Sequence, residues 1–337
     1  MSDSDQTTDS IPLRYRLPTT VSVQWKTAFE NLITLIRASG GLPKAPIVAD
    51  IDEWSAFSAD NNQLGERLAA PVLSRLGTQT RSHQFGGVAA LEYIPRVQRR
   101  DDRRIIYLHG GGYIAGSAKA NAIAPSTMAD LLEESVFSID YTLAPASRFE
   151  QTTDEVVAVF DAMNRGGISP NRTVLFGDSA GGGLAVAATL KMRDRGKQMP
   201  AALALWSPYL DLLFQGDSIR TLAHVDFADM ERATLAATMY AGPDDLKNPY
   251  ASPIYGNFSH GFPPTLIQAG TREVMLSDSV RLYQALEAAH CVAKLDLYEG
   301  MPHVHQAMAT ASESPEALLA CRKTAHFLQH WLTRSPD

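Results

Sequence analysis

The chain has 337 residues, of which 45% are hydrophobic and 20% charged, a composition typical of a globular protein with one large α/β domain or two ordinary ones. Its formal net charge of −7 argues against nucleic-acid binding, which requires a basic surface. The only dense basic stretch runs from Arg96 to Arg104, and because Asp101 and Asp102 interrupt it, we interpret it as a solvated turn.

Cysteine usage and the N-terminal residues bear on the compartment. Cys291 and Cys321 form no CxxC pair and no disulfide framework, which favours a reducing compartment. The polar, acidic N-terminus lacks the basic and apolar regions of a signal peptide. No apolar stretch approaches the roughly 20 residues that cross a bilayer. We therefore expect a cytoplasmic protein with no stable membrane association and no nucleic-acid partner.

Two helical segments come first, because apolar residues recur at helical spacing over residues 21–39 and, more weakly, over 51–73. After them, short aliphatic runs alternate with amphipathic segments. The short runs predict strands at 88–95, 103–109, 135–141, 173–177, 201–208, 264–270 and 292–300. The amphipathic segments predict helices at 122–135, 152–164, 180–190, 277–290 and 315–333. This alternation predicts a mostly parallel sheet covered by helices on both faces.

The alternation of strands and helices is interrupted between Asp211 and Pro264, where helical patterning and a proline-rich loop replace it. We interpret residues 212–262 as a helical insertion. Together with an N-terminal segment at 1–75, this insertion would form a cap above the sheet-containing domain at 76–337.

The segment VLFGDSAGGGLAVAATL, at 174–190, joins a predicted strand to a predicted helix through a run of glycines. Each glycine in a helix costs about 1 kcal/mol relative to alanine, so a functional reason is needed. Residues 177–181 fit G-x-S-x-G, and a strand-to-helix junction is the position of a nucleophile elbow. Ser179 would there project beside a helix N-terminus. We predict that Ser179 is a nucleophile; the alternative is a glycine-rich turn with an incidental serine.

A serine nucleophile needs a base and an acid, which in enzymes with this elbow follow in the order acid, then histidine. Glu273 lies in the loop after a predicted strand, whereas Asp278 lies at the head of the next helix. We favour Glu273 because such loops carry catalytic groups, and keep Asp278 as the alternative. His303 lies nearer its strand than His305 and is the favoured base. His303 and His305 could also be read as a pair of metal ligands. No cysteine or carboxylate cluster completes such a site, so we expect no metal.

The segment IIYLHGGGYIAGS, at 105–117, places His109 and three glycines directly after a strand. Such a loop offers backbone N–H groups to a tetrahedral oxyanion, together with the N–H of Ala180. We predict Gly110 and Gly111 as the donors from this loop. The alternative is that Gly112 replaces Gly110 as a donor.

The same loop also fits a dinucleotide-binding pattern, Gly110-x-Gly112-x-x-Ala115, with Asp140 as a possible ribose ligand. That interpretation leaves His109 unexplained and makes the elbow a coincidence. A phosphate-binding P-loop is excluded, since no G-K-[ST] follows the glycines. We therefore expect no cofactor.

Six motifs occur in order: HGGGY (109–113), DYTLAP (140–145), GDSAGG (177–182), SPYLDL (207–212), NPYASP (248–253) and MPHV (301–304). With them, the chain resembles the bacterial hormone-sensitive-lipase-like esterases, family IV of the lipolytic enzymes, from about Arg104 to the C-terminus. Many members have Asp-Pro-Leu at the acid, where this chain has Glu273-Val274-Met275, a glutamate that a smaller subgroup shares. DYTLAP also lacks the arginine and glutamate of the usual YRLAPE.

The resemblance implies an α/β-hydrolase fold with a helical cap and a carboxylesterase acting on short- to medium-chain esters through an acyl-enzyme. Its catalytic residues would be Ser179, Glu273 and His303, with an oxyanion hole of Gly110, Gly111 and Ala180. The expected partner is a small ester, with homodimerisation possible. A lactonase or amidase would use the same residues, and a ligand-binding pseudo-hydrolase would lack the histidine. Candidates for an acyl pocket, each also a plausible core residue, are Trp25, Phe29, Phe227, Met230 and Tyr240.

Overall fold

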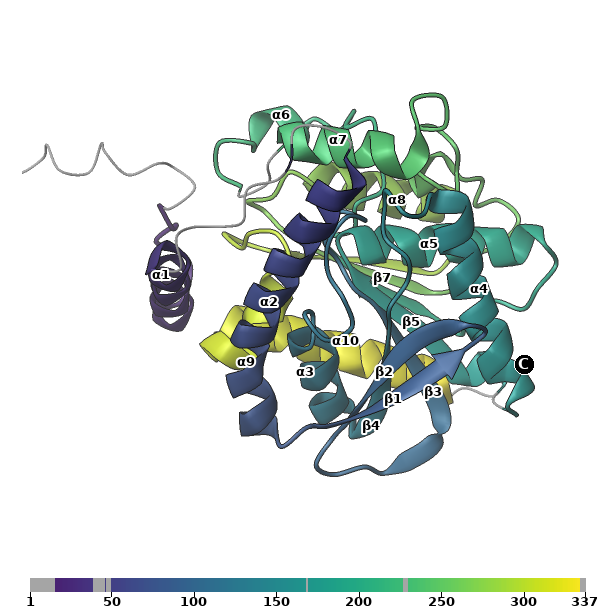
Figure 1. Ribbon diagram of the computed structural model, residues 1–337, viewed down its shortest axis with the longest axis horizontal. Helices are drawn as coiled ribbons and strands as arrows, with labels where there is room; N and C mark the ends of the chain where they lie inside the picture. Colours follow the sequence, from purple (N-terminus) through teal and green to yellow (C-terminus); the bar gives the residue numbers. More distant parts are fainter. Residues whose placement is uncertain (1–15, 39–45, 47–49, 168, 227–229, 334–337) are drawn as a thin grey trace, which may run out of the picture.

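The fold is built on one sheet of eight strands in the order β1-β2-β4-β3-β5-β6-β7-β8 (Figure 1). The computed structural model describes residues 16–38, 46, 50–167, 169–226 and 230–333. The strands are β1 (Gln79–Phe85), β2 (Val88–Ile94), β3 (Arg100–Leu108), β4 (Glu134–Ile139), β5 (Thr173–Asp178), β6 (Leu203–Trp206), β7 (Thr265–Gly270) and β8 (Ala293–Tyr298). The β1–β2 and β2–β4 pairs are antiparallel, and the other pairs are parallel. The mostly parallel sheet is thus confirmed.

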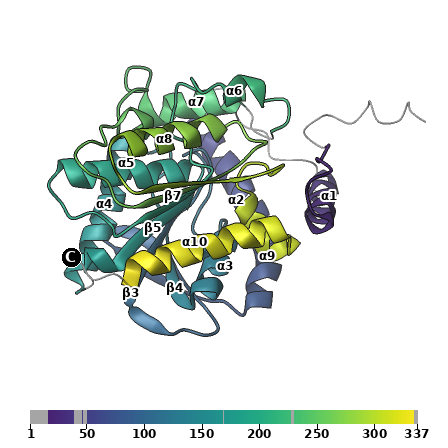
Figure 2. The same ribbon diagram turned by 180° about the vertical axis from the view of Figure 1, so that it is seen from behind.

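Helices cover both faces of this sheet, and α10 crosses one face (Figure 2). The helices are α1 (Val23–Ala38), α2 (Ile51–Leu76), α3 (Ile123–Leu132), α4 (Phe149–Arg165), α5 (Ala180–Asp194), α6 (Ser218–Thr221), α7 (Met230–Ala241), α8 (Leu276–Ala288), α9 (Ala309–Ser312) and α10 (Pro315–Thr333). Short 3-10 turns are η2 (Pro170–Arg172), η3 (Pro253–Tyr255) and η4 (His305–Met308). None of the helices in the described ranges is long and apolar enough to cross a membrane.

Alternating residues of the central strands pack into two hydrophobic cores, one on each face of the sheet. On β5, Leu175 packs with residues of α4, α5 and α8, whereas Val174 and Phe176 pack with residues of α3 and α10. Every residue of β5, β6 and β7 is buried, as expected for parallel strands covered on both faces. This burial fixes the strand register, and therefore fixes which side chains reach the carboxyl edge of the sheet.

Two local expectations were wrong at the antiparallel end of the sheet. The strand β1 was not predicted, because its sequence QTRSHQF is polar and most of its residues are exposed. The basic run is not all turn, since β3 begins at Arg100. Within it, Arg103 is buried and donates to Glu134 at 2.9 Å, so this residue faces the protein interior and not solvent.

The proposed cap segments lie around the sheet without a core of their own. Trp25 and Phe29 of α1 join the core on the α10 face, and Trp54 and Phe57 of α2 join the core on the α4–α5 face. In the insertion, α6 and α7 lie together at one end of the molecule (Figure 1). The boundaries predicted at 75, 212 and 262 therefore do not separate one hydrophobic core from another. The division into domains remains a prediction.

Candidate active site

Ser179 lies on the sharp turn between β5 and α5. Its backbone has φ 52° and ψ −120°, a strained conformation for a residue with a Cβ. Three hydrogen bonds hold the turn: Ser179 N–H donates to Trp206 O at 2.9 Å, and Ser179 O accepts from Tyr209 at 2.9 Å and Gly183 at 3.1 Å. Strain of this kind persists only where the surroundings impose it, which makes the turn a functional-site candidate.

The glycines at the start of α5 allow its backbone to lie directly against neighbouring segments. A Cβ on Gly181 would lie 1.9 Å from Leu108 O, and one on Gly183 would lie 2.1 Å from Tyr209 O. Both obstacles are backbone atoms, which cannot rotate away. Glycine therefore permits a close backbone contact here, at the cost of a poor helix propensity.

Replacing Gly181 with alanine is expected to destabilise the protein by about 3 kcal/mol or more, because the new methyl group must displace the end of β3. Urea unfolding monitored by circular dichroism measures the effect. Gly182→Ala is the matched control, since its Cβ would meet Pro208 Cβ at 3.1 Å and needs only a small shift. Equal stability of Gly181→Ala and wild type would show that the packing argument is wrong.

The structure brings together Ser179, His303 and Glu273 from three loops at the carboxyl ends of parallel strands. His303 Nε2 lies 3.0 Å from Ser179 Oγ, and His303 Nδ1 lies 2.8 Å from Glu273 Oε2. The imidazole is 26% exposed, whereas the glutamate side chain is fully buried. Glu273 Oε1 accepts from the N–H of Gly270 at 2.9 Å, which fixes the second carboxylate oxygen. The geometry is that of a nucleophile, a base and an orienting acid.

The electrostatics of His303 favour its protonated form. Burial by itself lowers its pKa, but the hydrogen bond and charge of Glu273, together with the charges of Asp226 and Asp178, raise the pKa above its ordinary value. A base with a raised pKa holds an abstracted proton more firmly.

The two alternative residues lie elsewhere. Asp278 Oδ2 accepts from the backbone N–H groups of Leu210 at 2.9 Å and Asp211 at 3.1 Å, so it anchors the turn after β6. Burial raises the pKa of Asp278 to about 7. His305 is fully buried against Trp25 and Tyr298, and burial lowers its pKa to about 3.

The glycine loop after β3 is tied to the elbow by Asp178. This buried carboxylate accepts from the Tyr107 hydroxyl and from the N–H of Gly110, the latter at 3.2 Å. Because its N–H is already donated to Asp178, Gly110 is a poor candidate for an oxyanion donor. Among the described residues, no acceptor engages the N–H groups of Gly111 or Gly112.

His109, which opens this loop, is buried and structural. Its ring stacks on Tyr141 at 4.3 Å, and its Nδ1 lies 2.9 Å from Gly110 O. The Tyr141 hydroxyl donates to His109 O at 2.6 Å. These contacts hold the glycines in place, and they give His109 a role that a dinucleotide site does not need.

The structure also argues against the dinucleotide interpretation of the glycine loop. No helix begins directly after the glycines, since α3 starts only at Ile123. Asp140 accepts from Ala118 N–H at 2.5 Å and so anchors the loop. Across the described ranges, no group of three or more His, Cys, Asp or Glu side chains is placed to hold a metal ion.

Most of the acyl-pocket candidates pack as core residues. Trp25, Phe29 and Tyr240 are buried, and Tyr240 stacks on Tyr113 at 3.8 Å. Met230 is half-buried at the start of α7, and Phe227 lies outside the described residues.

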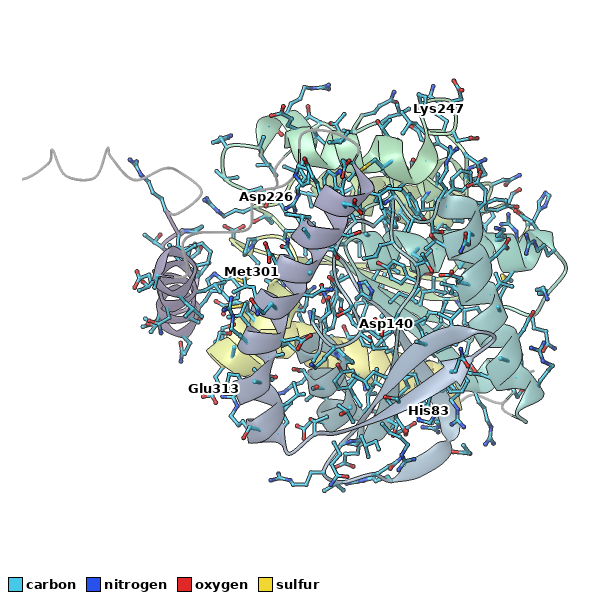
Figure 3. The ribbon with its side chains drawn as sticks, viewed as in Figure 1. His83, Asp140, Asp226, Lys247, Met301 and Glu313 are labelled. Carbon is cyan, nitrogen blue, oxygen red and sulfur yellow. The ribbon has the colours of Figure 1, made fainter. Side chains whose placement is uncertain are left out.

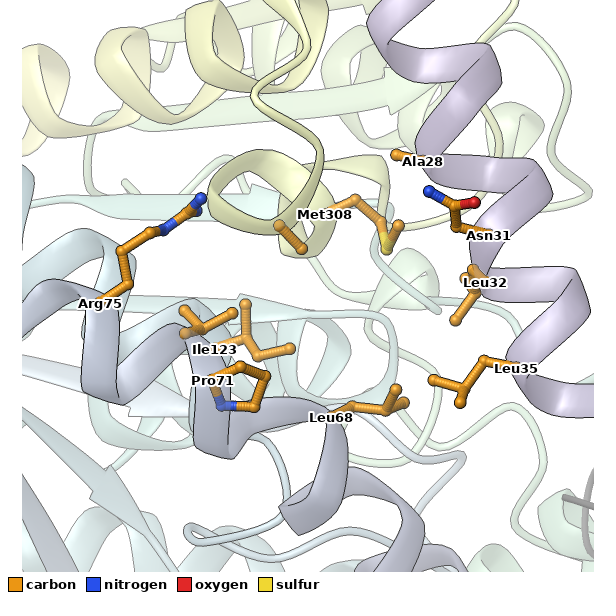
Figure 4. A pocket seen from close by; sticks show the side chains of 11 residues that line it. Ala28, Asn31, Leu32, Leu35, Leu68, Pro71, Arg75, Ile123 and Met308 are labelled. Carbon is orange, nitrogen blue, oxygen red and sulfur yellow. The ribbon is translucent and has the colours of Figure 1, made fainter.

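A mostly apolar pocket of ≈ 390 Å³ lies between α1 and α2 (Figure 4). It is lined by Ala28, Asn31, Leu32, Leu35, Leu68, Pro71, Val72, Arg75, Ile123, Met308 and Ala311. None of Ser179, Glu273 and His303 lines it, so it is distinct from the site at the elbow.

Two residues with contacts at the site were not singled out from the sequence. Tyr107 donates to Asp178, and Asp226, from the insertion, accepts from the residue after Glu273. Tyr107 lies on a buried strand and Asp226 in an irregular segment, so neither belongs to a motif that could have signalled it.

Comparison with known proteins agrees with this architecture. A family profile described as "alpha/beta hydrolase fold" matches residues 105–307. An acetyl-hydrolase of Streptomyces hygroscopicus is 37% identical over 213 residues, covering 62% of this chain and 70% of that protein. An esterase of Acinetobacter venetianus is 30% identical over 253 residues, covering 71% and 82%, respectively.

A solved structure described as an esterase from the bacterial hormone-sensitive lipase family superposes with a TM-score of 0.79. It is 32% identical, and the match covers 91% of this chain and 98% of that one. The fold and the elbow define an α/β hydrolase. The chain belongs, within that fold family, to the bacterial hormone-sensitive-lipase-like esterases and is a carboxylic ester hydrolase.

Proposed function

We propose that the protein is a serine carboxylesterase that hydrolyses short- to medium-chain esters through an acyl-enzyme on Ser179. The observation that carries this proposal is the continuous chain of contacts from Ser179 Oγ through His303 to Glu273, at 3.0 Å and 2.8 Å. A serine hydroxyl becomes a competent nucleophile when a positioned base accepts its proton.

In the first half-reaction, Ser179 Oγ attacks the ester carbonyl carbon while its proton passes to His303 Nε2. Glu273 keeps the other proton on Nδ1 and stabilises the imidazolium. The tetrahedral intermediate collapses, the C–O bond to the alcohol breaks, and His303 returns the proton to the leaving alkoxide. In the second half, His303 accepts a proton from a water whose oxygen attacks the acyl carbon. The bond from that carbon to Ser179 Oγ then breaks, His303 returns the proton to Oγ, and the acid is released.

The negative oxygen of each tetrahedral intermediate needs donors that are not already engaged. We assign this role to the N–H groups of Gly111, Gly112 and Ala180, one residue later in the glycine loop than the sequence suggested. Support comes from the hydrogen bond that occupies Gly110 and from Ala180 following the nucleophile at the start of α5. Asp178 then acts by holding the loop at the elbow.

The acyl preference rests on the resemblance and on the relative named an acetyl-hydrolase. The test is hydrolysis of p-nitrophenyl acetate, butyrate, octanoate and palmitate. We expect kcat/KM to peak at one of the two shortest esters and to be lower by about tenfold or more for palmitate, because the methylene groups of a long acyl chain that the site does not bury stay in water. A maximum at palmitate would contradict the proposal.

Rates measured with amide and lactone substrates distinguish the neighbouring chemistries. With p-nitroacetanilide and γ-butyrolactone as amide and lactone counterparts, we expect the ester to be the preferred substrate. A higher kcat/KM for either counterpart would replace the esterase assignment with an amidase or lactonase that uses the same residues.

A further inference from the structure

The loop that carries Glu273 is fixed by the helical insertion and not only by the sheet. Asp226 Oδ2 accepts from the N–H of Val274 at 2.6 Å, and Ser218 Oγ donates to the carbonyl oxygen of Val274 at 2.6 Å. Both backbone polar groups of the residue after the triad acid are therefore bound by side chains of the insertion. A buried backbone group that loses its partner is costly, so these contacts constrain the loop.

Further hydrogen bonds extend this attachment. Ser218 Oγ also accepts from Ser277 N–H at 2.9 Å, and Ser277 Oγ accepts from Ser218 N–H at 2.9 Å. The backbone of Asp226 is itself fixed, since its N–H donates to Leu222 O at 3.1 Å. The acid loop and the start of α8 are thus joined at several points to the start of α6 and to the segment after it.

Asp226 brings a charge as well as a hydrogen bond. Its side chain is buried, with the residue 1% exposed, on the insertion after α6 (Figure 3). It adds a negative charge that acts on His303 beside those of Glu273 and Asp178, and all three raise the pKa of His303. Among the described residues, the imidazole also lies 3.0 Å from the neutral Ser179 hydroxyl, and His305 adds no positive charge near it because burial lowers the pKa of His305. A buried carboxylate favours the imidazolium that forms during each proton transfer.

We propose that Asp226 is a positioning residue of the ester-hydrolysis reaction, which holds the Glu273 loop through Val274 and stabilises protonated His303 by its charge. The insertion therefore contributes to proton transfer and does more than cover the site. This inference rests on the proposed function, because it requires His303 to act as the base.

The test is the pH dependence of kcat and kcat/KM for p-nitrophenyl acetate in wild type and Asp226→Asn. The base must be neutral to accept a proton, so kcat/KM rises as the pH passes the pKa of His303. Asparagine keeps an oxygen for Val274 and removes the charge. We expect this rise to move to lower pH by roughly 0.5 pH unit or more, kcat on the plateau to fall by about tenfold, and KM to change by less than about twofold.

Two further variants separate charge from attachment. Ser218→Ala weakens the loop attachment without changing charge, so we expect a lower kcat and an unchanged pH midpoint. Asp244→Asn makes the same charge change at an exposed position of the insertion and is expected to alter neither. Thermal unfolding of each variant verifies folding.

The inference is overturned if Asp226→Asn keeps the wild-type pH midpoint, or if Asp244→Asn moves it equally. Should Asp226→Asn fail to fold, Ser218→Ala decides, because wild-type kcat in that variant would contradict the attachment. A wild-type protein without Ser179-dependent turnover would instead reject the proposed function, which is a separate outcome.

Discussion

Replacing Ser179 with alanine is expected to lower kcat for p-nitrophenyl acetate by roughly 10⁵- to 10⁶-fold, to the rate supported by binding and oxyanion stabilisation alone. The reason is the loss of Oγ, the nucleophilic atom, which lies 3.0 Å from His303 Nε2. Without it, no acyl-enzyme forms and the base has no proton to accept. Steady-state and burst kinetics on the two proteins measure the effect.

The fold is expected to survive this change. The strained turn is held by backbone hydrogen bonds from Ser179 to Trp206, Tyr209 and Gly183, which alanine retains. The urea midpoint should therefore stay close to that of wild type. As a control, Ser259→Ala removes a hydroxyl from an exposed loop and should leave kcat unchanged. Turnover by Ser179→Ala within about tenfold of wild type would show that the nucleophile lies elsewhere.

Replacing Glu273 with glutamine is expected to reduce kcat by up to about 10⁴-fold, the order seen when a triad carboxylate becomes an amide. A glutamine can still accept from Gly270 through its oxygen, but its NH₂ group then faces His303 Nδ1. That contact favours the tautomer of His303 with its proton on Nε2. This proton points at Ser179, so Nε2 cannot accept the serine proton.

The matched comparison is Asp278→Asn, which tests the alternative acid directly. Asparagine retains an oxygen for the N–H groups of Leu210 and Asp211, and the carboxylate that contacts the imidazole is that of Glu273, so kcat should fall by less than about tenfold. The ratio of the two kcat values is the measurement. A greater loss in Asp278→Asn than in Glu273→Gln would reverse the assignment of the acid.

Local sequence signals were sufficient to predict most strands of the central sheet. They were also sufficient to predict the order of the candidate nucleophile, acid and base along the chain. The strands β5 and β7 are short runs with mostly aliphatic centres, and every residue in them is buried. Such apolar centres are recognisable in a sequence even though both strands also contain buried polar residues. The strand β1 was missed for the opposite reason: its exposed edge residues have no hydrophobic pattern, and only pairing with β2 makes them a strand.

The glycine loop shows where sequence reasoning loses resolution. The motif identified HGGG as a source of N–H donors but could not say which groups are free. That depends on Asp178, which is 68 residues away in the chain and accepts from Gly110. The one-residue shift that we propose for the oxyanion donors rests on this long-range hydrogen bond, which no local pattern reports.

By itself, the sequence determined the parallel α/β architecture, the elbow at Ser179 and the short list of acids and bases, because these depend on local periodicity and on motifs at strand ends. The tertiary structure decided which candidates meet: Glu273 and not Asp278 lies against His303, and Asp226 of the insertion accepts from the N–H of Val274. Such choices depend on ångström-scale distances between segments far apart in the chain, which are fixed only when the sheet and its covering helices pack together.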